Sequence, residues 1–333
     1  MQGKCMIRFG VLGAGRIART FSEAMHGTEG VLYAVASRDG LKAAAFKEDF
    51  QFEVAYGSYE AMLKDPLVDC VYIATPHAFH YEQMLASIEH GKAILCEKAF
   101  TLNRHQAEIV FARAKAKGVF VMEAMWSRFL PVLREAITHV EAGTLGDLTH
   151  FEANFSFKAD HKLSDQSRLF NLALGGGALL DIGIYPINFA HVFLGLPKHV
   201  DATVTRHHTG ADLSEVITFQ YDKATARLTA GFDSEAPIEA TLYGTKGKLH
   251  MPLFWALEKA ILYDMDDTVV DVIEQPHRIN GFEYQIEDVI ACLQAGKLES
   301  LVMPHQTTLD MLGLMDGLRA AWDLKYPGES FFE

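Results

Sequence analysis

The sequence has little of what marks secreted, membrane-bound or zinc-binding proteins. Its four cysteines lie far apart and form no C-x-x-C pair, which argues against a disulfide framework and a zinc site. No apolar run reaches the roughly eighteen residues that a membrane span needs, and the N-terminus lacks the long apolar stretch of a signal peptide. We therefore expect a cytoplasmic protein that binds no membrane.

Positive charge is also scarce. Lysine and arginine number 30 against 43 aspartate and glutamate residues, so the 333-residue chain has a formal net charge of −13. This acidic balance excludes nucleic acid as the main partner, because the phosphate backbone repels a negatively charged protein. The 15 histidines are scattered apart from His207-His208 and show no H-E-x-x-H pattern, so the sequence assigns no metal.

The first third of the chain alternates short apolar runs with helical segments. We expect strands at 7–12, 31–36, 54–56, 70–74, 93–96 and 119–122. Strands that are apolar throughout are buried on both faces, and their alternation with helices indicates right-handed βαβ units in a parallel sheet. The sequence therefore predicts a doubly wound, dinucleotide-binding (Rossmann) domain.

The pattern changes after Glu123. Later segments, beginning with 148–157, alternate polar and apolar residues as half-buried antiparallel strands do. At about 150 residues per domain, a chain of this length holds two domains. We predict an α/β protein with a dinucleotide-binding domain at 1–124. Residues 125–333 form an α+β domain on a large, mostly antiparallel sheet that binds substrate.

A glycine motif opens the first predicted helix. Gly13-Ala14-Gly15-Arg16-Ile17-Ala18 fits G-x-G-x-x-G/A and directly follows a predicted strand. Gly13 permits the tight turn, and Gly15 lets the backbone approach a pyrophosphate on the helix N-terminus. The motif predicts a nucleotide site.

The end of the second strand bears on which nucleotide binds. An NAD site usually has an acidic residue about 20 positions past the first glycine, and Asp39 comes late for that contact. Ser37 and Arg38 suit a 2′-phosphate, so NADP(H) is favoured and NAD(H) is possible. The alternative is that Arg38 is a solvated turn residue and either cofactor is accepted.

Two groups of residues are candidates for chemistry. Glu97 and Lys98 fall at the carboxyl end of the fifth strand, where open α/β sheets bind ligands; otherwise Lys98 is a solvated charge. In the block 175–186, Asp181 and Tyr185 share a face if the segment is helical. Pro186 predicts a kink there. The alternatives are a helix cap for Asp181 and a half-buried core aromatic for Tyr185.

These motifs resemble the family of glucose–fructose oxidoreductase and inositol dehydrogenase over essentially the whole chain. The resemblance rests on the glycine motif, the 175–186 block and three shorter anchors: Thr75-Pro76-His77, His80 and Glu97-Lys98. Residues 122–131 and the tyrosine at 185 are similar to the branch of dihydrodiol and NADP-dependent xylose dehydrogenases.

The resemblance implies that Lys98 and Tyr185 form a catalytic pair supported by Asp181. It also places Thr75, Pro76, His77, His80 and Glu97 at the cofactor. It implies an open sheet in the second domain, which such proteins often use as a dimer face, so we expect a homodimer or a higher homo-oligomer. The family usually has proline after the lysine, whereas this chain has Ala99. A cis bond to alanine costs about 3 kcal/mol, so the sequence does not assure a kinked backbone there.

The chemistry agrees with this assignment. Removing a hydride from a carbinol carbon needs a base for the hydroxyl proton, and a nearby ammonium from Lys98 would favour the Tyr185 phenolate. We expect an NADP-preferring oxidoreductase acting on an aldose or a trans-dihydrodiol, with oxidation of a sugar at C1 to a lactone foremost. The alternatives are another sugar or keto-sugar dehydrogenase or reductase of the family, and a non-catalytic NADP(H)-sensing regulator.

Four further residues are candidates for substrate binding. Trp126 and Arg128 follow the sixth strand, and they could present a flat ring face and a guanidinium to the substrate or a cofactor phosphate. The alternative is a tryptophan packed in a domain interface and an arginine paired with a carboxylate. Arg168 and Asn171 precede the glycine block and could reach the substrate.

Overall fold

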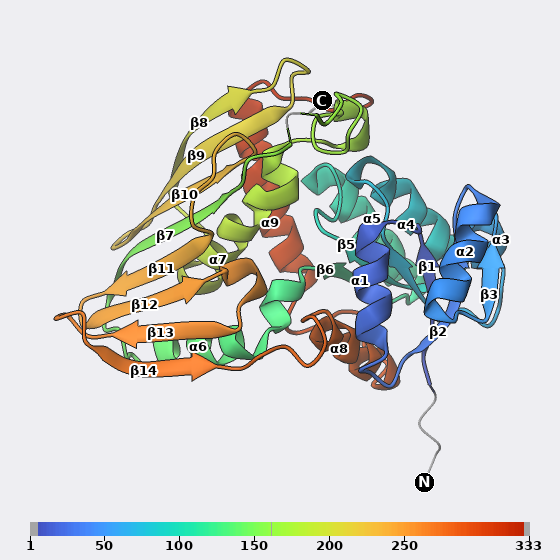
Figure 1. Ribbon diagram of the computed structural model, residues 1–333, viewed down its shortest axis with the longest axis horizontal. Helices are drawn as coiled ribbons and strands as arrows, with labels where there is room; N and C mark the ends of the chain where they lie inside the picture. The colour runs from blue at the N-terminus through green and yellow to red at the C-terminus, as the bar shows by residue number, and fades with distance from the viewer. Residues whose placement is uncertain (1–5, 161, 330–333) are drawn as a thin grey trace, which may run out of the picture. The chain divides into compact units, whose positions relative to one another are not determined.

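The computed structural model describes residues 6–160 and 162–329 (Figure 1). The chain forms two compact units. The first runs through Trp126 and includes His277–Leu309, and the second comprises Ser127–Pro276 with the chain from Asp310 on. The first boundary falls at 126 rather than 124. The return of residues 277–309 to the first unit departs from the contiguous division expected from the sequence.

A six-stranded parallel sheet forms the centre of the first unit (Figure 1). Its order is β3-β2-β1-β4-β5-β6, the order of the doubly wound dinucleotide-binding fold, so this part of the fold prediction is confirmed. The strands are β1 (Arg8–Leu12), β2 (Val31–Ala36), β3 (Val54–Tyr56), β4 (Cys70–Ile73), β5 (Ala93–Glu97) and β6 (Val121–Ala124). Leu12 pairs with Ile73, and Ile73 pairs with Cys96, so the strands end at one common edge.

Five helices connect these strands. They are α1 (Arg16–Met25), α2 (Gly40–Phe50), α3 (Tyr59–Leu63), α4 (His80–Glu89) and α5 (Arg104–Lys117). Strand β6 begins two residues later than expected because the Val119 N–H bonds the carbonyl of Ala114 and closes α5. Cys70, Cys96 and Cys292 are buried free thiols, and Cys5 lies outside the described residues.

Helix α8 (Glu283–Gln294) returns to the first unit and contacts α1. The Glu283 carboxylate accepts the N–H groups of Ile279, Asn280 and Gly281, at 2.8 to 3.2 Å, and so shapes the turn before the helix. The Asn280 side chain donates to the carbonyl of Thr20 in α1. The bond from Asn280 joins segments more than 250 residues apart, which a linear pattern of hydrophobicity does not reveal.

An eight-stranded sheet forms the second unit, in the order β14-β13-β12-β11-β7-β10-β9-β8. All neighbours are antiparallel except β7 and β10, which confirms the mostly antiparallel sheet. The strands are β7 (Leu148–Ser156), β8 (His199–Arg206), β9 (Asp212–Gln220), β10 (Thr225–Gly231), β11 (Glu239–Gly244), β12 (Gly247–Pro252), β13 (Lys259–Tyr263) and β14 (Val269–Glu274). The sequence did not predict β13 and β14; β14 is an edge strand whose residues are mostly exposed and lack alternation.

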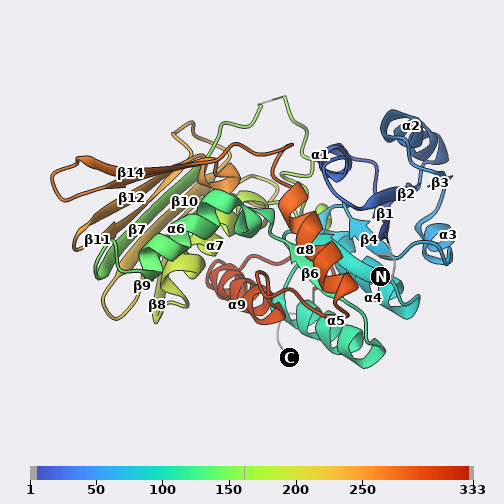
Figure 2. The ribbon, with the colours of Figure 1, turned by 90° about the horizontal axis from the view of Figure 1, so that it is seen from below.

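Two helices pack on one face of this sheet (Figure 2). Helix α6 (Pro131–Glu141) contacts β13 and β14, and α7 (Ile184–Leu194) contacts β7 and β10. Helix α9 (His305–Ala321) contains the third boundary between the units, at Leu309–Asp310. Alternation along β7 and β10 buries one set of side chains and leaves Glu152, Thr225 and Arg227 exposed.

One segment departs from the expectation that no apolar run is long enough to span a membrane. Leu172–Leu194 is long and apolar enough, by length and composition, to cross a membrane. In the structure, 72% of its apolar window is buried within the protein. Core helices of soluble proteins pass the same test, so the segment is weak support for a membrane span.

Candidate active site

Helix α1 begins directly at the carboxyl end of β1. Its N-cap residue, Gly15, supplies no side-chain hydrogen bond, and its first turn holds no acidic residue, so its N–H groups can meet an anion. Gly13 has a φ of +103°, and a Cβ there would lie 2.7 Å from the carbonyl oxygen of Ala74, so glycine is required. A Cβ at Gly15 would meet nothing within 4 Å. With Arg16 exposed and Ile17 half-buried, this turn fits a pyrophosphate.

The end of β2 presents one basic side chain. Arg38 is exposed, and its guanidinium lies 5.5 Å from the centre of the Phe79 ring. Ser37 is buried and accepts the N–H of Asp39. The Asp39 carboxylate caps α2 by accepting the N–H groups of Leu41 and Lys42. The Asp39 carboxylate is therefore engaged by the helix, and Arg38 is the charged side chain at the strand end.

His80 connects the loops that follow β4 and β5. The ring is fully buried, with Nε2 2.8 Å from the carbonyl oxygen of Thr75 and Nδ1 3.0 Å from that of Ala99. Burial lowers the pKa of His80, which outweighs the opposing effect of the carbonyl contacts. His80 thus links the Thr75 loop to the backbone just after Lys98. Pro76 and His77 lead into α4 through the 3₁₀ turn His77–Phe79, and the predicted contacts of these residues with cofactor stay predictions.

Lys98 stands between buried neighbours at the end of β5. Glu97 is buried and accepts the hydroxyl of Tyr72 at 2.5 Å, and burial raises the pKa of Glu97 to about 7. Lys98 itself is half-buried, and the Lys98–Ala99 peptide bond is cis. The sequence did not assure a kinked backbone after Lys98. The structure has the cis bond there, with alanine in the place of proline.

Sequence reasoning missed Glu123 as a support for this loop. Its carboxylate is 1% exposed; Oε1 accepts the N–H of Phe100, and Oε2 accepts the hydroxyl of Thr308. Glu123 thus holds the backbone two residues past Lys98. A glutamate within the apolar strand β6 was the available signal, because a buried carboxylate needs hydrogen-bond partners.

Trp126 is packed inside the first unit. Its side chain is 3% exposed, and its ring lies 4.8 Å from that of Phe282 and 6.1 Å from that of His277. This placement favours the packing alternative over a ring that stacks on substrate. The sequence could not separate the two because His277 and Phe282 are distant along the chain.

In the second unit, Asp181 and Tyr185 lie on continuous helical backbone. The expected kink before Pro186 takes the form of a π-helical turn, Leu179–Gly183, that runs directly into α7. Such turns are frequent at functional sites. Tyr185 is 5% exposed, and its ring lies 5.6 Å from that of Phe155 and 6.0 Å from that of Trp255. The segment is therefore helical, as the prediction that Asp181 and Tyr185 share a face requires.

Arg168 reaches Asp181 across the glycine block. Its Nη1 donates to Oδ2 of Asp181 at 2.8 Å, and the arginine side chain is 60% exposed against 12% for the aspartate. Asn171 caps the next turn, with its Oδ1 accepting the N–H of Ala173. A Cβ at Gly176 would lie 2.9 Å from the carbonyl oxygen of Asn171, so the block closes tightly on this loop. The structure thus joins Arg168 to Asp181 and uses Asn171 to shape the loop.

Arg128 belongs to a polar chain within the second unit. Its Nε donates to Oδ1 of Asn188 at 2.6 Å, and Nη2 lies 3.0 Å from Nδ1 of His191. Nε2 of His191 is 3.7 Å from the Asp310 carboxylate. Burial and the Arg128 charge lower the pKa of His191. This placement is close to the alternative in which Arg128 pairs with a carboxylate. Here His191 lies between the guanidinium and the carboxylate.

Two buried carboxyl groups pack against the segment that carries Asp181, and sequence reasoning missed both. Asp212 accepts the N–H of Leu179 at 2.5 Å, and a Cβ at Gly177 would collide with its carboxylate. A Cβ at Gly183 would collide with Glu215. Burial raises the pKa of Asp212 to about 6, and burial together with the Asp212 charge raises the pKa of Glu215 well above its ordinary range. For Glu215 the available signal was the alternation within β9, where it shares the buried phase of Ile217 and Phe219.

Comparisons with known proteins agree with this geometry. The family described as "Oxidoreductase family, NAD-binding Rossmann fold" matches residues 7–125, and "GFO/IDH/MocA C-terminal domain" matches residues 133–250. Trans-1,2-dihydrobenzene-1,2-diol dehydrogenase from Mus musculus is 32% identical, with 96% of this chain and 98% of that protein covered.

Solved structures show the same architecture. A 3-ketoreductase from Actinomadura kijaniata, in complex with NADP and TDP-benzene, is 27% identical with a TM-score of 0.85, and 95% of this chain and 98% of that one are covered. Levoglucosan dehydrogenase, in complex with NADH and levoglucosan, has a TM-score of 0.86 over 97% and 99% of the two chains. At 18% identity, the second likeness concerns the fold alone.

The parallel sheet, the uncapped helix behind the glycine motif and these matches define an NAD(P)-dependent oxidoreductase. The chain belongs to the Gfo/Idh/MocA oxidoreductase family, as its motifs predicted.

The buried Glu215 predicts a pH dependence of stability. The unfolded chain releases the Glu215 proton near the ordinary pKa of 4.5, whereas the folded protein retains it. Stability therefore falls above that pH, by up to about tenfold in the folding equilibrium per unit, until the folded pKa is reached. In Glu215→Gln this contribution is absent, so the melting temperature should fall less between about pH 5 and about pH 8 than in the parent protein.

Thermal denaturation at several pH values measures this difference. Glu152→Gln is the matched control, because Glu152 lies on β7 of the same sheet and is exposed. Its profile should follow that of the parent. Parallel profiles for Glu215→Gln and the parent would show that Glu215 is ionised in the folded protein.

Proposed function

We propose that the protein is an NADP-preferring dehydrogenase for the carbinol carbon of an aldose or a trans-dihydrodiol, with oxidation of a sugar at C1 to a lactone as the first candidate. The observation that carries the proposal is the arrangement around α7. Tyr185 lies among aromatic rings, and the Arg168–Asp181 ion pair lies on the turn that precedes it. Relatives named as a dihydrodiol dehydrogenase and a 3-ketoreductase support alcohol–carbonyl chemistry.

The surroundings of Tyr185 favour a ring that bears hydroxyl groups. Phe155 and Trp255 lie 5.4 Å apart between ring centres, and both contact Tyr185, so they offer an apolar wall. Arg168 and Asp181 offer hydrogen-bond donors and acceptors to hydroxyls. A sugar or a dihydrodiol combines an apolar ring face with polar edges, which matches this pairing.

Each residue has one role in the proposed step. A bound nicotinamide would supply the acceptor for the hydride of the carbinol carbon. Tyr185 accepts the hydroxyl proton as the carbonyl forms, and the Lys98 ammonium favours the tyrosine in its phenolate form. Asp181 holds the Arg168 guanidinium, which orients the neighbouring hydroxyl of the substrate. In the reverse direction Tyr185 returns the proton to the forming alkoxide.

Substituting Tyr185 tests this function. In Tyr185→Phe, kcat should fall by about 10²–10⁴-fold, because the proton acceptor is lost, while binding of NADPH stays unchanged. Reduction of NADP⁺ followed by absorbance, with a panel of pentoses, hexoses and dihydrodiols, measures kcat. NADPH fluorescence measures binding.

Tyr221→Phe is the matched control, because Tyr221 lies in the same unit and its hydroxyl makes only a 3.4 Å contact with the Gly195 carbonyl. It should keep the parent kcat. Turnover of Tyr185→Phe at the parent rate would remove Tyr185 from the proposed role. Tight NADPH binding with no turnover on any substrate or keto-sugar would instead favour the cofactor-sensing alternative.

The preference for NADP rests on Arg38. It is exposed at the end of β2, and the competing carboxylate of Asp39 is engaged in capping α2. A guanidinium binds a phosphate dianion in a charge-assisted, bidentate manner. NAD lacks this phosphate, so loss of Arg38 should affect the two cofactors unequally.

In Arg38→Ala, the KM for NADP⁺ should rise about tenfold to a hundredfold, as expected for loss of one charged hydrogen-bonding partner, while the KM for NAD⁺ stays constant. Arg19→Ala is the control, since Arg19 is an exposed arginine of the same unit that pairs with Asp49. Equal changes for both cofactors in Arg38→Ala would contradict a phosphate contact.

We also propose a homodimer formed through the exposed face of the second sheet. Arg227 of β10 and Glu152 of β7 are register partners near its centre, and both are exposed.

Light scattering should give twice the chain mass. Arg227→Glu places two like charges side by side and should shift the protein to monomer, whereas Arg113→Glu on α5, also exposed, should not. A parent protein of single-chain mass would refute the dimer.

A further inference from the structure

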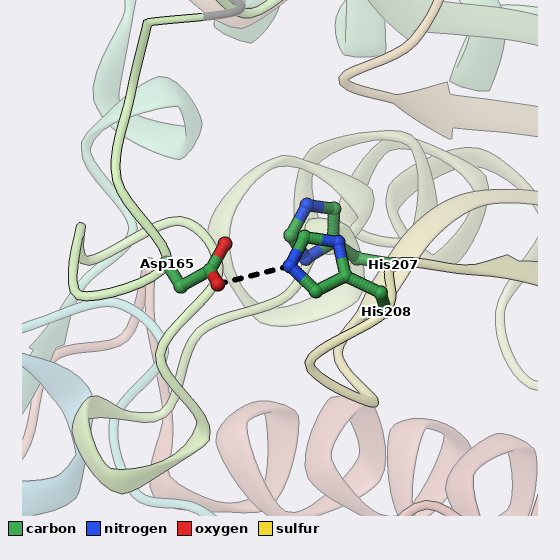
Figure 3. Close-up of side chains that lie close together, drawn as sticks. All are labelled: Asp165, His207 and His208. Carbon is green, nitrogen blue, oxygen red and sulfur yellow. Dashed lines mark hydrogen bonds and ion pairs between the residues drawn. The ribbon is translucent and has the colours of Figure 1, made fainter.

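Two histidines and an aspartate form a cluster in the second unit that the proposed chemistry does not use (Figure 3). His207 and His208 lie in the turn between β8 and β9, and Asp165 lies in the segment that follows β7. One nitrogen of each imidazole and one carboxylate oxygen all lie within 4.8 Å of one another. Nε2 of His208 is 2.9 Å from Oδ2 of Asp165.

The turn brings two consecutive histidine rings together. Neighbouring side chains of a strand point to opposite faces, but β8 ends at Arg206. The His207 N–H donates to the carbonyl of Ala211, and Gly210, with a φ of +93°, donates to the carbonyl of His207. The two ring centres consequently lie 4.0 Å apart, and both rings face the Asp165 segment (Figure 3).

The ring of His207 is held in one orientation. It stacks on Phe170, with 4.2 Å between ring centres and 13° between the planes. The Thr209 hydroxyl donates its proton to the carbonyl of Phe170 at 2.8 Å, so the 3.0 Å contact between Thr209 Oγ1 and His207 Nδ1 requires the proton on Nδ1. The 3.4 Å contact from the Thr209 N–H is too long to compete. Nε2 of His207 therefore keeps its lone pair, as in histidines that bind metals.

The cluster lines a pocket of about 420 Å³. Asp160 and Asp233 also line it, against a single lysine, Lys158, so its charge favours a cation. The pocket has room for water molecules, which complete the coordination of a metal held by three side chains.

We propose that His207, His208 and Asp165 bind a divalent transition-metal ion of the zinc, nickel and cobalt class. Two imidazoles and one carboxylate suit these ions, whereas Ca²⁺ and Mg²⁺ prefer oxygen ligands alone. The ion would link the segment after β7 to the β8–β9 turn. Arg168, which pairs with Asp181, lies three residues beyond Asp165, so the ion would restrain the segment that carries this arginine.

Calorimetric titration of the full chain with Zn²⁺ tests the proposal, with Mg²⁺ as the comparison ion. We expect one Zn²⁺ per chain, no Mg²⁺ binding, and at least about tenfold weaker Zn²⁺ binding in His208→Ala and Asp165→Asn. Zn²⁺ should also raise the melting temperature of the parent protein and not that of these variants. His208 and Asp165 are both exposed, so their substitution leaves the core intact.

His199→Ala is the matched control. His199 lies on β8 and pairs with Asp201 at 3.2 Å, and among the described residues this pair gains no third ligand. The control should bind Zn²⁺ as the parent does. Absence of Zn²⁺ binding in the parent overturns the proposal, and so does binding of equal affinity in His208→Ala and Asp165→Asn.

Discussion

Parallel pairing in the order β3-β2-β1-β4-β5-β6 places the carboxyl end of every strand at one edge of the first sheet. The glycine turn, Arg38, the Thr75 loop and Lys98 all follow strands at that edge. Because ligands of doubly wound sheets bind there, strand order alone decides which residues can meet a dinucleotide. The uncapped N-terminus of α1 then supplies the anion-binding groups.

In both units, buried polar groups bond the backbone beside the candidate catalytic residues. His80 and Glu123 bond the carbonyl and the N–H of the Ala99–Phe100 peptide unit, just after Lys98. In the second unit, Asp212 bonds the first residue of the π turn that contains Asp181. Burying polar groups costs free energy unless they are hydrogen-bonded, so these residues are retained where a loop must be held in one conformation.

Local patterns were sufficient for much of the protein. All strands of the first sheet except β6 lie within one residue of their expected bounds. Apolar runs, caps and glycine stops act within a few residues, as Asn103 and Gly118 do at the ends of α5. The glycine motif and Lys98 were placed correctly at the sheet edge for the same reason. The edge strand β14 escaped prediction because an exposed strand needs no hydrophobic alternation.

The sequence by itself thus determined the parallel sheet, the nucleotide motif, the candidate pair Lys98 and Tyr185, and the family. Only the tertiary structure decided that residues 277–309 join the first unit, that Trp126 is packed away, and that Asp165 meets His207 and His208. The physical reason is sequence separation. Local propensity acts over a few residues, whereas packing and hydrogen bonding between distant segments appear only once the chain has folded.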